Sequence, residues 1–300
     1  MRSVLSSRSF ASYSSFGIFE SVKNPSNISP PELRNNLWYM GIKYYNIHTE
    51  ETMTASALVI LIFFIFVLIM TSSRGMKLEK QIGIAGIRSI VQMFAMGFAL
   101  EYIFRLDNVW HVLYFGAFMA VFAAYTASSR LDIDCTCHKR AFFCIYVPSM
   151  LALLPVFLSG AVPVEMSAVL PVAGMALGNS MNAYTLSLDR LRAESSSHLA
   201  SIEGMLALGL TVKTATNEAV NTSIKAGMMP VLNNIASLGV VLLPGLATGL
   251  LMAGVKPLTA VTYQLVIMYM LLAVNILTSV LACRMFTMRV LRAASSEGNE

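Results

Sequence analysis

Long apolar stretches without a charged residue alternate with short polar segments along most of this chain. Asp, Glu, Lys and Arg are absent from residues 52–73, 108–129, 141–164, 166–188, 226–255 and 257–283. A helix needs about 20 mostly apolar residues to cross a lipid bilayer. The pattern therefore predicts about seven membrane-spanning helices, near residues 54–72, 82–104, 108–127, 141–159, 167–186, 231–253 and 258–282.

The composition favours an all-α, polytopic transmembrane helical bundle over a soluble fold. Only 12% of the 300 residues are charged and 56% are hydrophobic, whereas soluble domains carry roughly 25% charged residues. The net charge of +5 does not indicate a nucleic-acid partner. Such a partner requires basic residues clustered on one face, and here they fall between the apolar runs.

The basic residues are divided unevenly between the two sides of the predicted bundle. Cytoplasmic loops of membrane proteins carry an excess of Lys and Arg. On one side lie only Lys43, Arg105 and Lys256. The bias predicts an outside or lumenal N-terminus and a cytosolic C-terminus. The basic residues on the predicted cytosolic side are Arg74, Lys77, Lys80, Arg130, Lys139, Arg140, Arg190, Arg192, Lys213, Lys225, Arg284, Arg289 and Arg292.

Residues 1–50 differ in kind from the transmembrane domain that we assign to residues 51–292, and residues 293–300 form a short tail. Residues 1–16 are rich in Ser and Arg, and no acidic residue precedes Glu20. This composition suits an organellar transit peptide, and a disordered tail fits it equally well. The sequence leaves open whether this extension is cleaved and whether the membrane is the plasma membrane or an organellar one.

The segment 187–230 is the one sizeable polar segment between spans, and it lies on the predicted cytosolic side. Gly209 can end a helix in the left-handed conformation, and Thr211 can cap a following helix that runs towards Pro230. The segment is therefore predicted to be an amphipathic helix–turn–helix. In its first half, apolar residues recur at helical spacing, at Leu188, Leu191, Leu199, Ile202 and Leu206.

Arg88 is the one charged residue deep inside a predicted span, with Gln92 one turn further on. A charge in the bilayer is costly, so such residues usually face a bundle interior or an aqueous path. The alternative is that Arg88 lies close enough to the cytosolic interface to extend its guanidinium into water.

Two spans combine small residues with unusual polarity. Gly174 and Gly178 form a GxxxG pattern followed by Asn179 and Ser180, and Gly245 and Gly249 form a second pattern after a proline. GxxxG lets helices approach closely, and a proline inside a helix can kink it, as Pro244 could here. These features fit the lining of a transport path, and simple helix packing is the alternative.

Cys135, Cys137 and His138 could bind a metal in the loop between spans 3 and 4. The CxC spacing lacks the paired CxxC of a strong zinc site, and reduced thiols are ordinary in the cytosol. Cys283, at the end of span 7, stands apart in the sequence, so no disulfide framework is indicated. The chain carries no GxxxxGK[ST] phosphate loop and no hydrolase signature. An enzyme is therefore not expected, and no cofactor is expected to bind this chain.

The stretch Glu203–Gly209 keeps the Glu-to-Gly spacing of the EAA loop in ABC importer permeases, although Gly204 and Met205 replace its two alanines. Over about residues 54–292, the chain resembles the family of small permeases that includes the bacterial iron export permease and plant aluminium-tolerance proteins. The stretches that carry the resemblance are Arg88–Gln92, 97–104, Gly174–Met175, Gly178–Met181, Glu203–Gly209, Pro230, Leu243–Gly245, Thr248–Gly249 and Tyr263–Gln264.

The resemblance implies the membrane-spanning permease subunit of an ABC transporter, a homodimer in the membrane, that uses ATP bound by a separate ATPase subunit. Glu203, Leu206 and Gly209 would couple it to the ATPase, and the candidates for the transport path would be Arg88, Gln92, Asn179, Ser180 and Gln264. Iron export and nucleotide-sugar transport are both proposed in the family, so neither the substrate nor the transport direction transfers. The alternatives are an autonomous carrier or channel for a metal ion, and a membrane scaffold or metal sensor acting through Cys135–His138.

Overall fold

The structure is all-helical over the residues that it describes, as the charge-free runs predict. The computed structural model describes residues 59–72, 79–103, 109–131, 137–160, 162, 166–242 and 244–297. The only strand-like feature of this part is an isolated bridge between Leu238 and Leu242. The chain divides into two compact units, residues 1–97 and 98–300. The N-terminal extension lies outside the described residues.

The first unit contains the helix Val59–Ser72 and most of α4 (Glu79–Ile103). Gly86 on α4 lies against the ring of Phe64 on the preceding helix. A Cβ at position 86 would lie 2.6 Å from Cζ of Phe64, which is far too close for any larger residue. The small residue therefore lets this hairpin of two helices close.

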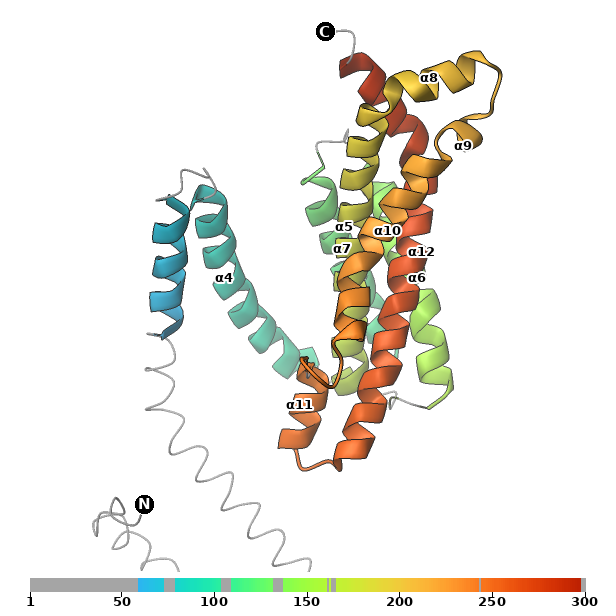
Figure 1. The fold of residues 1–300 in the computed structure, drawn as a ribbon. Helices are drawn as coiled ribbons and strands as arrows, with labels where there is room; N and C mark the ends of the chain where they lie inside the picture. The colour runs from blue at the N-terminus through green and yellow to red at the C-terminus, as the bar shows by residue number, and fades with distance from the viewer. Residues whose placement is uncertain are drawn as a thin grey trace, which may run out of the picture. The chain divides into compact units, whose positions relative to one another are not determined.

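The second unit is a helical bundle built around α7 (Figure 1). Helix α7 packs against each of the other long helices of the unit, and α12 packs against α6 and α10 as well. Helices α8 and α9 form a turn at one end of the bundle, and α11 lies at the opposite end against α12. The bounds are α5 Val109–Ser128, α6 Cys137–Leu158, α7 Met166–Ser197, α8 Leu199–Ala207, α9 Val212–Ala215, α10 Asn217–Ala236, α11 Gly245–Met252 and α12 Pro257–Glu297.

Three described helices are long and apolar enough to cross a membrane, at residues 80–100, 138–158 and 257–292. Two shorter apolar helices cover residues 59–72 and 114–128. Helix α7 is less apolar than these because Asn179, Ser180 and Asn182 fall in its middle. Of these three residues, Asn179 and Asn182 line a cavity, described below.

The predicted loop 187–230 is largely part of the bundle. Helix α7 continues to Ser197, and α10 begins at Asn217 and runs through Pro230. The proline does not end α10, because buried residues before and after it, Gly227 and Val231, hold the helix against the bundle. Val231 is only 1% exposed. The compact turn therefore comprises α8 and α9 alone. Within it, the left-handed conformation predicted for Gly209 is confirmed, with φ of +87°. Thr211 does cap a helix, since its Oγ1 accepts a hydrogen bond from the backbone N–H of Thr214. That helix is the short α9, which ends at Ala215, and not the helix that runs through Pro230.

The predicted span 231–253 is not one kinked helix, so the prediction for Pro244 is wrong. Helix α10 ends at Ala236, and Pro244 precedes α11 with an extended backbone conformation. A proline is well tolerated at the start of a helix, where its missing N–H would have had no partner within the helix. Its carbonyl is not left free, since it accepts a hydrogen bond from the N–H of Thr248.

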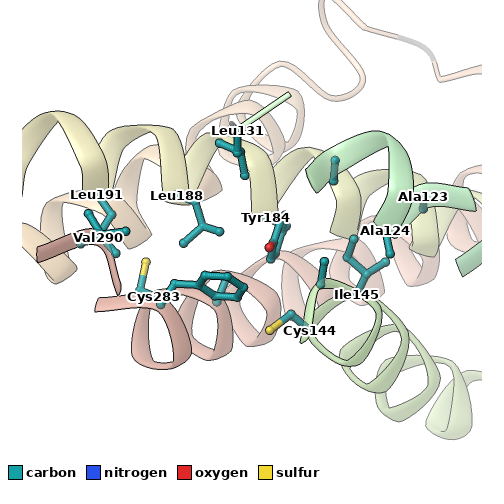
Figure 2. Close-up of a cluster of buried hydrophobic side chains, with 14 of the residues drawn as sticks. Ala123, Ala124, Leu131, Cys144, Ile145, Tyr184, Leu188, Leu191, Cys283 and Val290 are labelled. Carbon is teal, nitrogen blue, oxygen red and sulfur yellow. The ribbon is translucent and has the colours of Figure 1, made fainter. Parts of the chain in front are cut away.

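A packed apolar cluster joins α5, α6, α7 and α12 (Figure 2). Tyr184 and Phe286 are fully buried in it and meet edge to face, with ring centroids 5.8 Å apart. Cys144 and Cys283 are both buried in the same cluster, and Cys144 Sγ lies 3.5 Å from the sulfur of Met285. Cys283 therefore shares this cluster with Cys144, although the two lie far apart in the sequence.

Candidate functional site

A small, partly open cavity lies between α7, α10 and α12, next to the end of α5. Its volume is about 220 Å³. Three asparagines, a threonine and an arginine contribute to its lining, which is unusual in so apolar a bundle. The lining residues are Arg130, Asn179, Asn182, Ala183, Thr185, Leu186, Gly227, Pro230 and Asn275.

The helical repeat of α7 brings Asn179, Asn182 and Leu186 to one side, since residues three and four apart share a face. The Asn179 Nδ2 donates to the carbonyl of Met175 at 2.9 Å. The Thr185 hydroxyl donates to its own helix in the same way. Both side chains therefore keep oxygen atoms available as acceptors.

Asn275 lines the cavity from α12 and is only 3% exposed. Its Oδ1 has no hydrogen-bond partner among the described residues. Burying a polar atom without a partner costs about 1–3 kcal/mol. The cost makes Asn275 a candidate for binding a solute in the cavity.

Gly227 marks the closest approach of α10 to its neighbours, beside the cavity. A Cβ there would lie 2.5 Å from Ser279 Oγ, 3.0 Å from the carbonyl oxygen of Ala183, and closer still to Ser187 Oγ. Both serine side chains are fully buried, and neither hydroxyl oxygen has a partner in the described part of the chain. A buried polar patch therefore adjoins the cavity at the contact of three helices.

The other predicted path residues of this unit lie elsewhere. Ser180 is buried in the packed interior, where its hydroxyl hydrogen-bonds Thr278 Oγ1 at 2.7 Å and the carbonyl of Ile145 at 3.1 Å. Gln264 accepts a hydrogen bond from the backbone N–H of Ala247 at 3.2 Å and so ties α12 to α11. Neither residue lines the cavity. Of the predicted path residues in this unit, only Asn179 does.

Arg88 and Gln92 lie one turn apart on α4, in the first unit. They share one face of that helix, as their spacing predicts.

The glycines of the two GxxxG patterns differ in their surroundings. At Gly174 a Cβ would lie 3.2 Å from the terminal methyl of Met119, so this glycine does allow close packing with α5. At Gly178, Gly245 and Gly249 no atom of the described structure lies within 4 Å of such a Cβ. Close contacts within the described chain do not explain these three glycines.

The residues predicted to couple to an ATPase lie in the turn of α8 and α9. Glu203 is exposed, Leu206 is half-buried, and Gly209 forms the left-handed turn between the helices. Leu208 is 82% exposed and Leu210 is 39% exposed at this turn. At the end of α7, Glu194 contacts Arg190 at 2.5 Å and His198 at 3.5 Å, which ties that end of the helix to the start of the turn.

The candidate metal loop is only partly described. Cys135 lies outside the described residues, and Cys137 is the first residue of α6. His138 stacks on Tyr125, with ring centroids 5.6 Å apart. Among the described residues, no three His, Cys, Asp or Glu side chains come together in a way that could hold a metal ion.

Sequence reasoning missed several residues of the cavity and the turn. Arg130 lines the cavity, whereas its place in the sequence marks it only as a topology signal. Asn275 is a lone asparagine in a charge-free span and is not among the predicted path residues. Leu208 and Leu210 do not stand out in the sequence, because apolar residues are expected throughout such a chain. The signal for Asn275 was present, since a polar residue inside a span usually faces the bundle interior.

Comparison with known proteins identifies relatives over most of the chain. The model of the "Uncharacterised protein family (UPF0014)" matches residues 54–291. The "Probable iron export permease protein FetB" of Escherichia coli is 32% identical over 239 residues, which cover 80% of this chain and 90% of that protein. "Protein ALUMINUM SENSITIVE 3" of Arabidopsis thaliana is 30% identical over 226 residues, covering 75% and 82% of the two chains. The "UPF0014 membrane protein STAR2" of Oryza sativa is 32% identical over 211 residues, covering 70% and 74%. No solved structure matches.

Proposed function

The chain belongs to the UPF0014 family, and from this premise we propose that it is the membrane-spanning permease subunit of an ABC transporter. A separate ATPase subunit would bind and hydrolyse the ATP, and two copies of the chain would form the membrane unit. The solute would be a metal ion or a small polar solute. The name of the E. coli relative, an iron export permease, supports a permease for metal ions.

The observation that carries the proposal is the turn of α8 and α9. It lies at one end of the bundle (Figure 1), and the apolar side chain of Leu208 is 82% exposed there. Burying this exposed apolar side chain against a partner protein would be favourable. We expect the ATPase to bind here, with Glu203 and Leu206 on the same short helix. The proposal requires the turn to lie on the cytosolic side, and the basic residues at its flanks support this.

Affinity purification of the full chain from native membranes tests the partner. We expect an ATPase subunit to co-purify with the unchanged protein and to be lost from Leu208→Asp. The matched control is Val240→Asp, since Val240 is 92% exposed in the turn after the other end of α10. Equal recovery of the ATPase with both variants would contradict docking at this turn.

Reconstitution separates the permease from the alternative functions. Flux in proteoliposomes that contain this chain alone would indicate an autonomous carrier or channel instead. A metal sensor would lose its function in Cys135→Ser with Cys137→Ser and keep it in Glu203→Ala. For an ATP-driven permease we expect the reverse, with transport lost in Glu203→Ala combined with Gly209→Ala.

A further inference from the structure

The charge of the cavity lining does not match a bare metal ion. Among the described residues that line the cavity, Arg130 is the only charged one, and none of them carries a carboxylate, thiol or imidazole. Hard metal ions are usually held by carboxylates together with other oxygen ligands, and softer ones by imidazole or sulfur. A positive guanidinium beside neutral amides instead attracts a negative solute.

We propose that this cavity binds a small oxyanion that carries hydroxyl hydrogens, of the phosphate type. The guanidinium of Arg130 presents donors in a planar fork that fits the oxygens of phosphate. Arg130 follows the last turn of α5, where its backbone N–H donates to the carbonyl of Ala127 at 3.4 Å. Arg130 is exposed and lines the cavity from the end of α5.

The remaining polar groups select for hydroxyl hydrogens on the solute. Asn179 and Thr185 each donate a hydrogen bond within α7, which leaves their oxygens as acceptors. Asn275 adds a buried Oδ1 that lacks a partner in the described part of the chain. A solute that donates an O–H group to Asn275 Oδ1 offsets the cost of burying that oxygen. Phosphate keeps hydroxyl hydrogens near neutral pH, whereas sulfate has none.

The size of the cavity limits the solute. Sites for drug-sized molecules occupy about 300–1,000 Å³, and this cavity is smaller, at about 220 Å³. It can hold a phosphate ion or the phosphate group of a larger ester. The inference rests on the proposed function in one respect only, because it takes the cavity to be part of the permease path.

Binding to the full chain in nanodiscs of neutral lipid, measured by isothermal titration calorimetry, tests the proposal without an ATPase. We expect inorganic phosphate to bind and sulfate to bind more weakly. Loss of one charge-assisted interaction in Arg130→Gln should weaken phosphate binding about tenfold or more. Lys139→Gln is the control, since it removes the same charge from an exposed position in the first turn of α6.

Asn275→Leu gives a second readout. It removes the unpartnered oxygen at similar volume, and we expect phosphate to lose its advantage over sulfate. Equal phosphate binding by Arg130→Gln and the unchanged protein, with unchanged thermal unfolding, would overturn the proposal. So would binding of Fe²⁺ at the cavity with no binding of phosphate.

The phosphate could be free in water or belong to a lipid headgroup. Repeating the titration in nanodiscs that contain phosphatidic acid distinguishes these sources. If phosphatidic acid weakens phosphate binding to the unchanged protein but has no such effect on Arg130→Gln, the lipid headgroup occupies the cavity. If phosphatidic acid leaves phosphate binding unchanged, the cavity binds a soluble solute. Both results support an oxyanion site. If phosphate does not bind while the ATPase still co-purifies, this inference fails and the proposed function stands.

Discussion

Helix α7 presents two contrasting faces to its neighbours. On one face, Tyr184, Leu188 and Leu191 are at most 1% exposed within the packed apolar cluster. On the opposite face, Asn179 and Asn182 line the cavity. These three side chains of the first face belong to the apolar cluster, whereas Asn275 Oδ1 in the cavity and the hydroxyls of Ser187 and Ser279 beside it are buried without partners in the described part of the chain. The difference indicates that the cluster holds the bundle together and that the cavity is kept at a cost to stability.

The largest effect is expected from Phe286→Ala in the packed cluster. Removing a fully buried aromatic ring costs about 3–5 kcal/mol, because the transfer energy is lost and a void remains. Thermal unfolding of the purified protein should show a marked loss of stability. Asn182→Ala on the cavity face is the control and should unfold close to the unchanged protein. Similar losses in both variants would remove the contrast between the two faces.

A smaller loss is expected from Gly227→Ala at the contact beside the cavity. The added methyl would press against the hydroxyls of Ser187 and Ser279, and overpacking of this kind costs about 1–3 kcal/mol. The triple variant that also carries Ser187→Ala and Ser279→Ala should recover part of this stability. Gly178→Ala is the control, since its Cβ meets no described atom within 4 Å. A larger loss of stability in Gly178→Ala than in Gly227→Ala would contradict the close packing of α10 at Gly227.

Two serines of α7 provide a finer test. Ser180→Ala removes hydrogen bonds to Thr278 and Ile145, and we expect a loss of about 1 kcal/mol. Ser187→Ala removes a hydroxyl whose oxygen has no partner in the described structure, so we expect no loss. Both changes delete one oxygen from a fully buried serine of the same helix. Thermal unfolding of the two variants in parallel should separate them, and the opposite order would contradict these contacts.

The smallest effect on stability is expected from Asn275→Leu. Replacing a buried amide that has an unpartnered oxygen by an apolar side chain of similar size should leave the unfolding temperature unchanged or raise it. Transport in proteoliposomes that also contain the ATPase should fall at the same time. A variant that is clearly less stable would show that Asn275 serves the packing of α12 and not the cavity.

Much of the fold could be predicted because charges are excluded from lipid. The charge-free runs located the main helices, and the conformations of Gly209 and Thr211 followed from local rules for helix ends. The extent of α7 and α10 could not be found in this way. Residues such as Arg190 and Lys225 look like loop residues in the sequence, but they lie on helices that continue past the apolar stretch.

The cavity was predicted only in part, because a sequence does not show which side of a helix meets which neighbour. Asn179 and Ser180 are adjacent, yet one lines the cavity and the other is buried in the interior. Consecutive residues of a helix point about 100° apart, since 3.6 residues make one turn. Arg130 and Asn275 are brought together only by the packing of α5, α7 and α12.

The turn and the cavity are built on the same two helices. One residue, His198, separates α7 from α8, and one residue, Thr216, separates α9 from α10. Helices α7 and α10 then form two walls of the cavity. At about 1.5 Å per residue, the 32 residues of α7 form a helix roughly 48 Å long. A force applied at the turn therefore reaches both walls together through stiff helices, and a tilt of one against the other would change the volume between them.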